Sequence, residues 1–448
     1  MKKSKSVWTD LYRMVGLCSV AGIVILTGCI PIETGEENQL GEPVGCMVDR
    51  PDPGGCVVLN SIAAFDGAGD LDEACYTIHD TYTVEERTLN VSPGTTLYFG
   101  EDAGIRVLDS GALSAVGTSN DPICMYGLEE QRGYWRGLRF LNSPSADNRL
   151  DHVVLEHAGS RTWTTNRQAR NHGGVVVIGD DVQLTVSNAT FQNNQRPAII
   201  ATDSPQSGLT VTSSIFRNNE MALQIQAENV RNISEDTVIE DNDVPGLVLF
   251  SAAGDNHHVV TDATWPAFSF PYRVKSFFTV AQGSHLEIAP GARFEFEEGA
   301  GIRVAGATMA AVGEADAPIV FEGTEPVAGH WRGIYFTSTS SDRNRLRHVE
   351  VHHGGGHQWH HGRETSQGNI VLSDNNPTCN AENMALVEIS NALITHSAQF
   401  GIAIRRGHNV TGCGEIEFQN IANDNIHDRN TELSGGGGCF CESGCDCG

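Results

Sequence analysis

Residues 89–99 read LNVSPGTTLYF, and residues 286–296 read LEIAPGARFEF. The likeness extends downstream through the segments AGIRV, AVG, WRG and NRL, each of which recurs 196 or 197 residues later in the same order. A match of this length indicates an internal duplication, because self-similarity at a fixed offset is the signature of a repeat architecture. We therefore divide the chain into copy one, at about 84–250, and copy two, at about 280–434.

A shorter repeat is visible inside copy one. Phe191, Phe216 and Ile239 occupy equivalent places in SNATFQNNQRPAII, TSSIFRNNEMALQI and EDTVIEDNDVPGLVL, at separations of 25 and 23 residues. Short alternating segments bounded by turn residues indicate strands, and a period near 24 residues is typical of a solenoid whose units bury their apolar faces by stacking. We expect these three side chains to form one interior column. The Asn pairs at 193–194 and 218–219 should lie at the turns and hydrogen-bond in a ladder.

The pattern resembles the right-handed parallel β-helix of pectin-lyase-like solenoids. The duplicated P-G, A-V-G and W-x-G-[IL]-x-F signatures are similar to those of bacterial β-helix-repeat lipoproteins. The resemblance implies an all-β fold, a right-handed parallel β-helix (solenoid) with internal duplication. We expect an N-terminal cap at 56–83, the β-helix at 84–434 and a Gly/Cys-rich tail at 435–448.

Residues 1–28 have the features of a lipoprotein signal peptide. Basic residues precede an apolar run, Met14–Leu26, which is shorter than the roughly 20 residues that a membrane-spanning helix needs. The run ends in the tetrapeptide LTGC, which resembles the bacterial lipoprotein processing site and implies acylation of Cys29. Residues 29–55 are rich in Pro, Gly and Glu, which predicts a flexible tether. We expect an exported protein, anchored by lipid to the outer membrane or cell surface.

The composition is acidic, with 29 Lys and Arg against 56 Asp and Glu and a formal net charge of −27. This balance disfavours nucleic acid as a partner. Of the 12 cysteines, Cys18 lies in the signal and Cys29 at the anchor, and the even number that remains favours disulfides in an exported chain. A bridge among Cys46, Cys56 and Cys75 would close the exposed N-terminal end of the solenoid. The C-x-C-x3-C-x-C tail leaves soft-metal binding as an alternative to oxidation.

The dipeptides Trp135-Arg136 and Trp331-Arg332 occupy equivalent positions in the two copies. An exposed indole beside a guanidinium forms a stacking surface for a sugar ring or an acidic polymer, so these four residues are candidate ligand-binding residues. The alternative is that each tryptophan packs over the following strand. Its presence in both copies favours packing, because a duplicated residue is as readily needed by the fold as by a ligand.

Histidines are concentrated in RLRHVEVHHGGGHQWHHGRE, at 345–364. Side chains alternate along a strand, so Val349 and Val351 should point inward and their neighbours outward. Outward histidines with a carboxylate can chelate a divalent metal. The alternative is a solvated polar strand followed by a Gly-rich loop, and we expect no cofactor. The candidate metal ligands are His348, Glu350, His352, His353, His357, His360 and His361.

Motifs of polysaccharide-cleaving enzymes are incomplete. Gly179-Asp180-Asp181 resembles the paired-Asp motif of polygalacturonase-type hydrolases and Arg273-Val274-Lys275 their R-x-K, but the intervening Gly-His-Gly is missing. The sequence therefore favours a non-catalytic binding or structural surface, with polysaccharides or envelope components as candidate partners. A polysaccharide lyase or glycoside hydrolase is the alternative. Metal capture by the His-rich and Cys-rich segments is a further alternative function.

Overall fold

The computed structural model describes residues 46, 50–59, 70–164, 171–202, 208–251, 257–359, 366–373, 385–405, 408–412 and 415–428. All of them belong to one compact unit, Pro43–Gly448. The signal peptide, Cys29 and the tail at 435–448 lie outside the described residues. In the described ranges, no helix is both long enough and apolar enough to cross a membrane.

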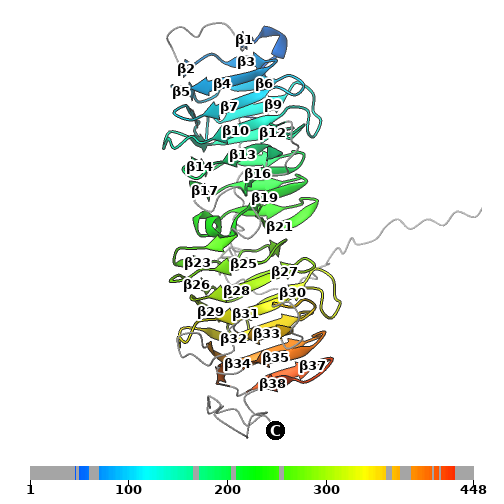
Figure 1. Ribbon diagram of the computed structural model, residues 1–448. Helices are drawn as coiled ribbons and strands as arrows, with labels where there is room; N and C mark the ends of the chain where they lie inside the picture. The colour runs from blue at the N-terminus through cyan, green and yellow to red at the C-terminus, as the bar shows by residue number, and fades with distance from the viewer. Residues whose placement is uncertain are drawn as a thin grey trace, which may run out of the picture. The chain divides into compact units, whose positions relative to one another are not determined.

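The unit is built of coils that follow one another in chain order, and each complete coil of copy one adds a strand to each of three parallel sheets (Figure 1). The first sheet consists of β1 (Val57–Leu59), β3 (Cys75–Ile78), β6 (Thr96–Phe99), β9 (Ile123–Gly127), β12 (Val153–Glu156), β15 (Thr190–Gln192), β18 (Ile215–Arg217) and β20 (Val238–Glu240). The second consists of β2 (Asp70–Leu71), β5 (Thr88–Val91), β8 (Ala112–Val116), β11 (Arg149–Asp151), β14 (Gln183–Ser187) and β17 (Gly208–Thr212). The third consists of β4 (Thr81–Glu85), β7 (Gly104–Leu108), β10 (Gly137–Leu141), β13 (Val175–Ile178), β16 (Pro197–Ala201), β19 (Met221–Ile225) and β21 (Val244–Leu249).

Copy two repeats this scheme with one difference. The long strands β32 and β34 each bend at a corner of the coil, so that the two halves of each strand pair with different neighbouring strands. One sheet holds β22 (His258–Val259), β25 (Phe278–Val280), β28 (Gly301–Ala305), β31 (Gly333–Thr337), β33 (Gly368–Leu372), β35 (Phe400–Ile404) and β38 (Ile426–Asp428). The other two faces hold β23 (Ala263–Trp265), β24 (Tyr272–Val274), β26 (His285–Ile288), β27 (Arg293–Phe296), β29 (Thr308–Val312), β30 (Ile319–Gly323), β32 (Arg345–His352), β34 (Leu386–Thr395), β36 (Asn409–Thr411) and β37 (Ile416–Gln419). Short 3-10 helices lie at η2 (Pro53–Gly55) and η4 (Ala227–Asn232).

All strand pairs are parallel, and the predicted fold class, a right-handed parallel β-helix with internal duplication, is confirmed. The coils begin before residue 84, since β3 and β4 of the segment expected as a cap pair with β6 and β7. Where the two copies join, the equivalent faces of the coils do not line up. The strand β21 belongs to the third sheet and pairs with β24. The 197-residue offset makes β24 the equivalent of β3, which belongs to the first sheet. The sequence contains no signal for this change.

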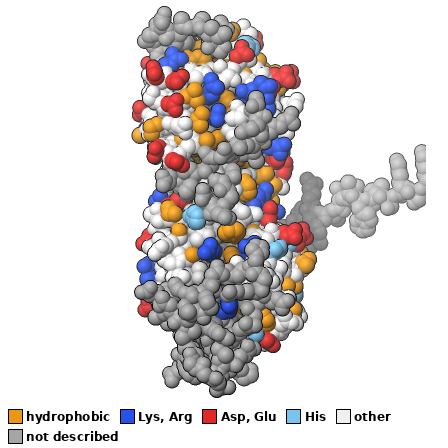
Figure 2. Space-filling model, viewed as in Figure 1, with side chains coloured by type: hydrophobic (Ala, Val, Ile, Leu, Met, Phe, Trp, Pro, Cys, Tyr) orange, Lys and Arg blue, Asp and Glu red, His pale blue; other side chains and the backbone are white. Residues whose placement is uncertain are grey.

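The predicted interior column is confirmed. Phe191 is in register with Phe216, which is in register with Ile239, and all three side chains are buried. The two phenyl rings stack with their centroids 4.9 Å apart. Outside this column, Figure 2 shows acidic and basic side chains interspersed with apolar ones over the face drawn.

The predicted asparagine ladder is also present at the turns. Asn194 Nδ2 donates to Asn219 Oδ1 at 2.9 Å, and Asn219 Nδ2 donates to Asn242 Oδ1 at 3.0 Å. Asn194 and Asn219 are fully buried, so these bonds satisfy amide groups that would otherwise be costly to desolvate.

Two disulfides hold the N-terminal end of the unit. Cys56 is bonded to Cys75, and Cys46 is bonded to Cys124 in β9. The expected bridge at this end is therefore confirmed, although Cys46 pairs with a cysteine deeper in copy one. Cys379 and Cys413 lie outside the described residues.

Candidate functional site

Histidines and asparagines occupy the tight corners of the coils. His157 and Asn193 have φ values of 67° and 54° at one corner of copy one, and the equivalent His353 and His396 have 66° and 52° in copy two. The left-handed conformation is uncommon for most residues, and Asn, Asp and His adopt it several-fold more readily. The backbone geometry thus accounts for several of the histidines that the sequence suggested as metal ligands, including His348, whose φ is 47°.

The histidine-rich strand has the predicted orientation, with Val349 and Val351 buried and His348, Glu350 and His352 facing outward. His352 Nε2 lies 3.2 Å from Glu350 Oε2, and the ring of His353 lies 5.4 Å from that of His396. Burial, with the neighbouring His352 and His396, lowers the pKa of His353.

The candidate metal ligands do not converge in the part of the chain that the structure describes, which contains no group of three His, Cys, Asp or Glu residues able to hold a metal ion. His357 lies beside Gly299, where a Cβ atom would be 3.7 Å from its Nε2 atom. His360 and His361 lie outside the described residues.

The two tryptophans of the WRG segments are core residues. Trp135 and Trp331 are 0% exposed, and they stack on Phe99 and Phe296 with ring centroids 3.9 and 4.0 Å apart. Trp135 Nε1 donates to the carbonyl oxygen of Glu156 at 2.6 Å. This corrects the interpretation of these indoles as a sugar-stacking surface, because neither ring has a face open to solvent. The alternative interpretation, that each tryptophan packs in the core, is therefore correct for both Trp135 and Trp331.

The neighbouring arginines do stack on aromatic rings, but on different tryptophans. The guanidinium carbons of Arg136 and Arg332 lie 5.0 Å from the ring centroids of Trp163 and Trp359, which belong to equivalent loops. Gly104 leaves room for the Trp163 indole, since a Cβ atom there would lie 2.9 Å from its Cη2 atom. These half-buried pairs cover the outer face of the adjoining sheets.

The hydrolase-like motifs are not assembled. Asp180 and Asp181 lie in the turn between β13 and β14, as expected. Arg273 lies on β24, several coils further on, where its Nε atom is 3.3 Å from Glu297 Oε1.

A polar cleft of about 710 Å³ lies on the outer side of the first sheet in copy one. Glu156 ends β12 and Gln192 ends β15, and the two residues are in register. Their preceding neighbours Leu155 and Phe191 point into the core, so alternation directs Glu156 and Gln192 outward. The cleft is lined by Arg50, Glu130, Arg132, Glu156, His157, Gln192 and Asn193.

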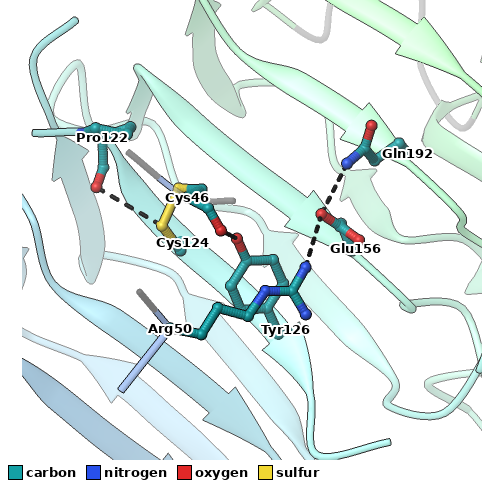
Figure 3. The surroundings of a disulfide bond; sticks show 7 residues. All are labelled: Cys46, Arg50, Pro122, Cys124, Tyr126, Glu156 and Gln192. Carbon is teal, nitrogen blue, oxygen red and sulfur yellow. Dashed lines mark hydrogen bonds and ion pairs between the residues drawn. A yellow bond between two sulfur atoms is a disulfide. The ribbon is translucent and has the colours of Figure 1, made fainter. Parts of the chain in front are cut away.

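The Glu156 carboxylate is the centre of the cleft, and its side chain is only 4% exposed. Gln192 Nε2 donates to Oε1 at 2.8 Å and Asn193 Nδ2 donates to Oε2 at 3.5 Å. Arg50 Nη2 lies 3.8 Å from Oε1 (Figure 3), and His157 Nε2 lies 3.6 Å from Oε2. Burial lowers the pKa of His157 despite this carboxylate, so its imidazole is neutral at pH 7.

The Cys46–Cys124 disulfide holds Arg50 over the cleft. The guanidinium of Arg50 lies 4.1 Å from the ring centroid of Tyr126, whose hydroxyl donates to the carbonyl oxygen of Cys46 at 2.7 Å (Figure 3). Burial raises the pKa of Tyr126, which keeps this hydroxyl protonated. Arg50 Nη1 also donates to Glu130 Oε1 at 2.9 Å.

Sequence reasoning missed this site. It placed Arg50 in a flexible tether, whereas Arg50 packs against Tyr126, and it did not single out Glu156. The usable signal was the position of Arg50 between two cysteines. Cys46 is bridged to Cys124 in copy one, and Cys56 is bridged to Cys75 in the segment before it.

The fold is that of a parallel β-helix protein, and a polar cleft lies on one of its two duplicated halves. A family model described as "Periplasmic copper-binding protein (NosD)" matches residues 84–259. The described residues in that range do not fit a copper site, because no three His, Cys, Asp or Glu side chains converge and Cys124 is in a disulfide.

Two solved structures of a Streptococcus pneumoniae protein are similar to the chain. One, titled "Structure of the Streptococcus pneumoniae surface protein and adhesin PfbA", has 13% identity and a TM-score of 0.29, over 80% of this chain and 92% of that one. The other, "Crystal structure of PfbA, a surface adhesin of Streptococcus pneumoniae", has 12% identity and a TM-score of 0.30, over 84% and 89%. No curated protein matches the chain.

Proposed function

We propose that this protein is an exported lipoprotein whose copy-one cleft binds glycans at the cell envelope without cleaving them. The two disulfides support export, because such bonds persist in oxidising compartments. The LTGC tetrapeptide supports acylation of Cys29, and more than one acyl chain gives stable membrane anchoring.

The observation that carries the proposal is the buried Glu156 carboxylate at the floor of a cleft of about 710 Å³. Glycan hydroxyls both donate and accept hydrogen bonds. The cleft offers Glu156 as an acceptor, Arg50 and Arg132 as donors, and Gln192 and Asn193 as side-chain amides that serve in either role. Its volume lies within the roughly 300–1,000 Å³ typical of ligand sites.

The carboxylates of the cleft favour binding over hydrolysis. Glycosidases place two carboxyl groups on either side of the scissile bond, one of them with a raised pKa. Here the side chain of Glu130 is 77% exposed and paired with Arg50, while Glu156 already accepts a hydrogen bond from Gln192. Both carboxyl groups are therefore paired within the chain rather than free to flank a scissile bond.

One observation favours a second function, cleavage of uronate polymers by β-elimination. The neutral imidazole of His157 can accept a proton, and Arg50 in the same cleft is suited to a substrate carboxylate. The formation of unsaturated products, followed by ultraviolet absorbance with and without calcium, separates this function from binding alone.

Binding is tested on the acylated chain in detergent, by calorimetry against a panel of neutral and uronic-acid oligosaccharides. Glu156→Gln should weaken the affinity at least tenfold, because it removes the charged acceptor. The matched control is His352→Gln, at the equivalent position of copy two, and it should leave the affinity unchanged. Equal affinities of the wild type and Glu156→Gln for every oligosaccharide would exclude the cleft as the binding site.

The anchor is tested separately. Replacing Cys29 by Ser should move the protein from the membrane fraction to the soluble periplasmic fraction, because the acyl chains have no other attachment point. Unchanged membrane fractionation of this variant would contradict the lipid anchor and leave the cleft unaffected.

A further inference from the structure

Three arginines lie together on the outer face of the third sheet in copy one, one sheet away from the polar cleft. Arg106 in β7 and Arg139 in β10 are in register on adjacent strands, and Arg136 lies in the turn that enters β10. Arg139 is only 8% exposed. We call these three residues the arginine cluster.

The hydrogen-bond partners of the arginine cluster are neutral. Within the described ranges, none of the three guanidiniums has a carboxylate within 4.0 Å, although the chain holds 56 Asp and Glu residues. The Nε atoms of all three are buried and have no hydrogen-bond partner. The bonds that do form run from Arg106 Nη2 to Thr83 Oγ1 (3.1 Å), from Arg136 Nη1 to Thr81 Oγ1 (3.4 Å) and from Arg139 Nη2 to Asn171 Oδ1 (3.3 Å).

The nearby acid Asp102 is already occupied. It lies 3.1 Å from Arg161 Nη1 and accepts a hydrogen bond from Ser160 Oγ at 2.6 Å. Burial, together with neighbouring arginines, lowers the pKa of both Arg136 and Arg139. Desolvated guanidiniums to which the described residues offer no counter-ion are costly, so a negative charge on a ligand would stabilise the arrangement.

We propose that the arginine cluster binds an oxyanion, the carboxylate, sulfate or phosphate group of a ligand. Guanidiniums bind such groups through paired N–H donors, and Arg106 and Arg139, which are in register, present their donors from adjacent strands. The Trp163 ring that stacks on Arg136 provides an apolar wall beside the charged group. Inorganic anions and acidic sugars share this chemistry.

Copy two shows that the fold does not require the arginine cluster. The equivalent residues are Arg303, which is exposed, Arg332 and Tyr335. Tyr335 takes the place of Arg139, and its hydroxyl donates to the carbonyl oxygen of Ser373 at 2.8 Å. Copy two therefore builds the same coil with one buried cation fewer, so Arg139 is not needed for the fold of this coil.

The test is thermal denaturation of the full acylated chain in detergent, titrated with sulfate, phosphate or glucuronate at constant ionic strength set with chloride. Each oxyanion that binds should raise the melting temperature to a plateau. Arg139→Gln should shift the midpoint concentration at least tenfold. Because Arg139 is buried, Arg106→Gln at the half-buried neighbour provides a second variant, and circular dichroism checks that both fold.

The control variants are Arg303→Gln and Arg332→Gln in copy two, which should keep the wild-type midpoint. Glu156→Gln should also keep it, so failure of the cleft and failure of the arginine cluster are distinguishable. A plateau with sulfate or phosphate identifies a site for free anions, whereas a plateau with glucuronate alone identifies a sugar carboxylate. Unchanged midpoints in both Arg106→Gln and Arg139→Gln, or no plateau with any of the three anions, would overturn the proposal.

Discussion

Gln192 and Glu156 are neighbours in register on adjacent strands, and Gln192 Nε2 donates to Glu156 Oε1 at 2.8 Å. The equivalent pair in copy two is Thr395 and His352, whose Oγ1 and Nδ1 atoms are 2.7 Å apart. The duplication has therefore kept a cross-strand hydrogen bond at this place while its chemistry changed from carboxylate and amide to imidazole and hydroxyl. Among the described residues, copy one alone combines this bond with a cation, Arg50, held by a disulfide.

Truncating Gln192 to Ala should lower the free energy of unfolding by about 1–3 kcal/mol, because it removes a hydrogen bond to a buried carboxylate. Urea denaturation measures the change. The matched variant Thr395→Ala in copy two should cost less, since the hydrogen bond that it removes does not involve a carboxylate. Equal losses in the two variants would show that the Glu156 carboxylate does not depend on Gln192.

Truncating Phe216 to Ala should cost about 3–5 kcal/mol, because it opens a cavity between Phe191 and Ile239. The control is Val327→Ala, whose side chain is 60% exposed and whose loss should change stability by less than about 0.5 kcal/mol. Denaturant titration of both variants provides the comparison. A loss below about 1 kcal/mol for Phe216→Ala is incompatible with an interior column.

Removing the Cys46–Cys124 bridge by replacing both residues with Ser should destabilise the protein and weaken ligand binding together. The bridge closes a span of 78 residues, worth about 4.5 kcal/mol in the chain-entropy model, and it also fixes Arg50 over the cleft.

The Cys56–Cys75 bridge is the control, since it closes only 19 residues, worth about 3 kcal/mol. Its removal should lower the melting temperature less and leave binding closer to the wild type. Wild-type affinity after loss of Cys46–Cys124 would show that Arg50 needs no covalent support.

Acidification should destabilise the protein through His257. Burial lowers the pKa of this residue in the folded chain to about 3, against an ordinary value of 6.5. The unfolded chain therefore binds a proton that the folded chain does not, over the window from pH 6.5 to about 3. The titration of His257 therefore leaves the free energy of unfolding unchanged well above pH 6.5. Below pH 6.5, and down to about pH 3, it lowers this free energy by about 1.4 kcal/mol for each pH unit.

The variant His257→Asn retains an acceptor for the backbone N–H of Ala227 and cannot titrate. Its melting temperature, measured from pH 7 to pH 4, should fall less steeply than that of the wild type. His157, His172, His285 and His353, whose pKa values are also lowered by burial, add a residual slope of the same sign. Parallel profiles for the wild type and the variant would contradict the assignment to His257.

The sequence predicted the features that repeat. The spacing of Phe191, Phe216 and Ile239 located the interior column because the coil period places one residue of each coil at the same position. It did not predict the cleft, because Arg50 and Glu156 meet through a disulfide between residues 78 positions apart. The clustered histidines were considered as candidate metal ligands beside the alternative of a solvated polar strand, but backbone geometry at coil corners also selects this residue type.

Glycan binding in the cleft is tested most directly by a crystal structure of the protein soaked with the oligosaccharide that binds most tightly in calorimetry. Glycan binding in the copy-one cleft predicts sugar density there, with a hydroxyl within hydrogen-bond distance of the Glu156 carboxylate and another near Arg50 or Arg132. Density on any other face, with the cleft filled only by water, would contradict it.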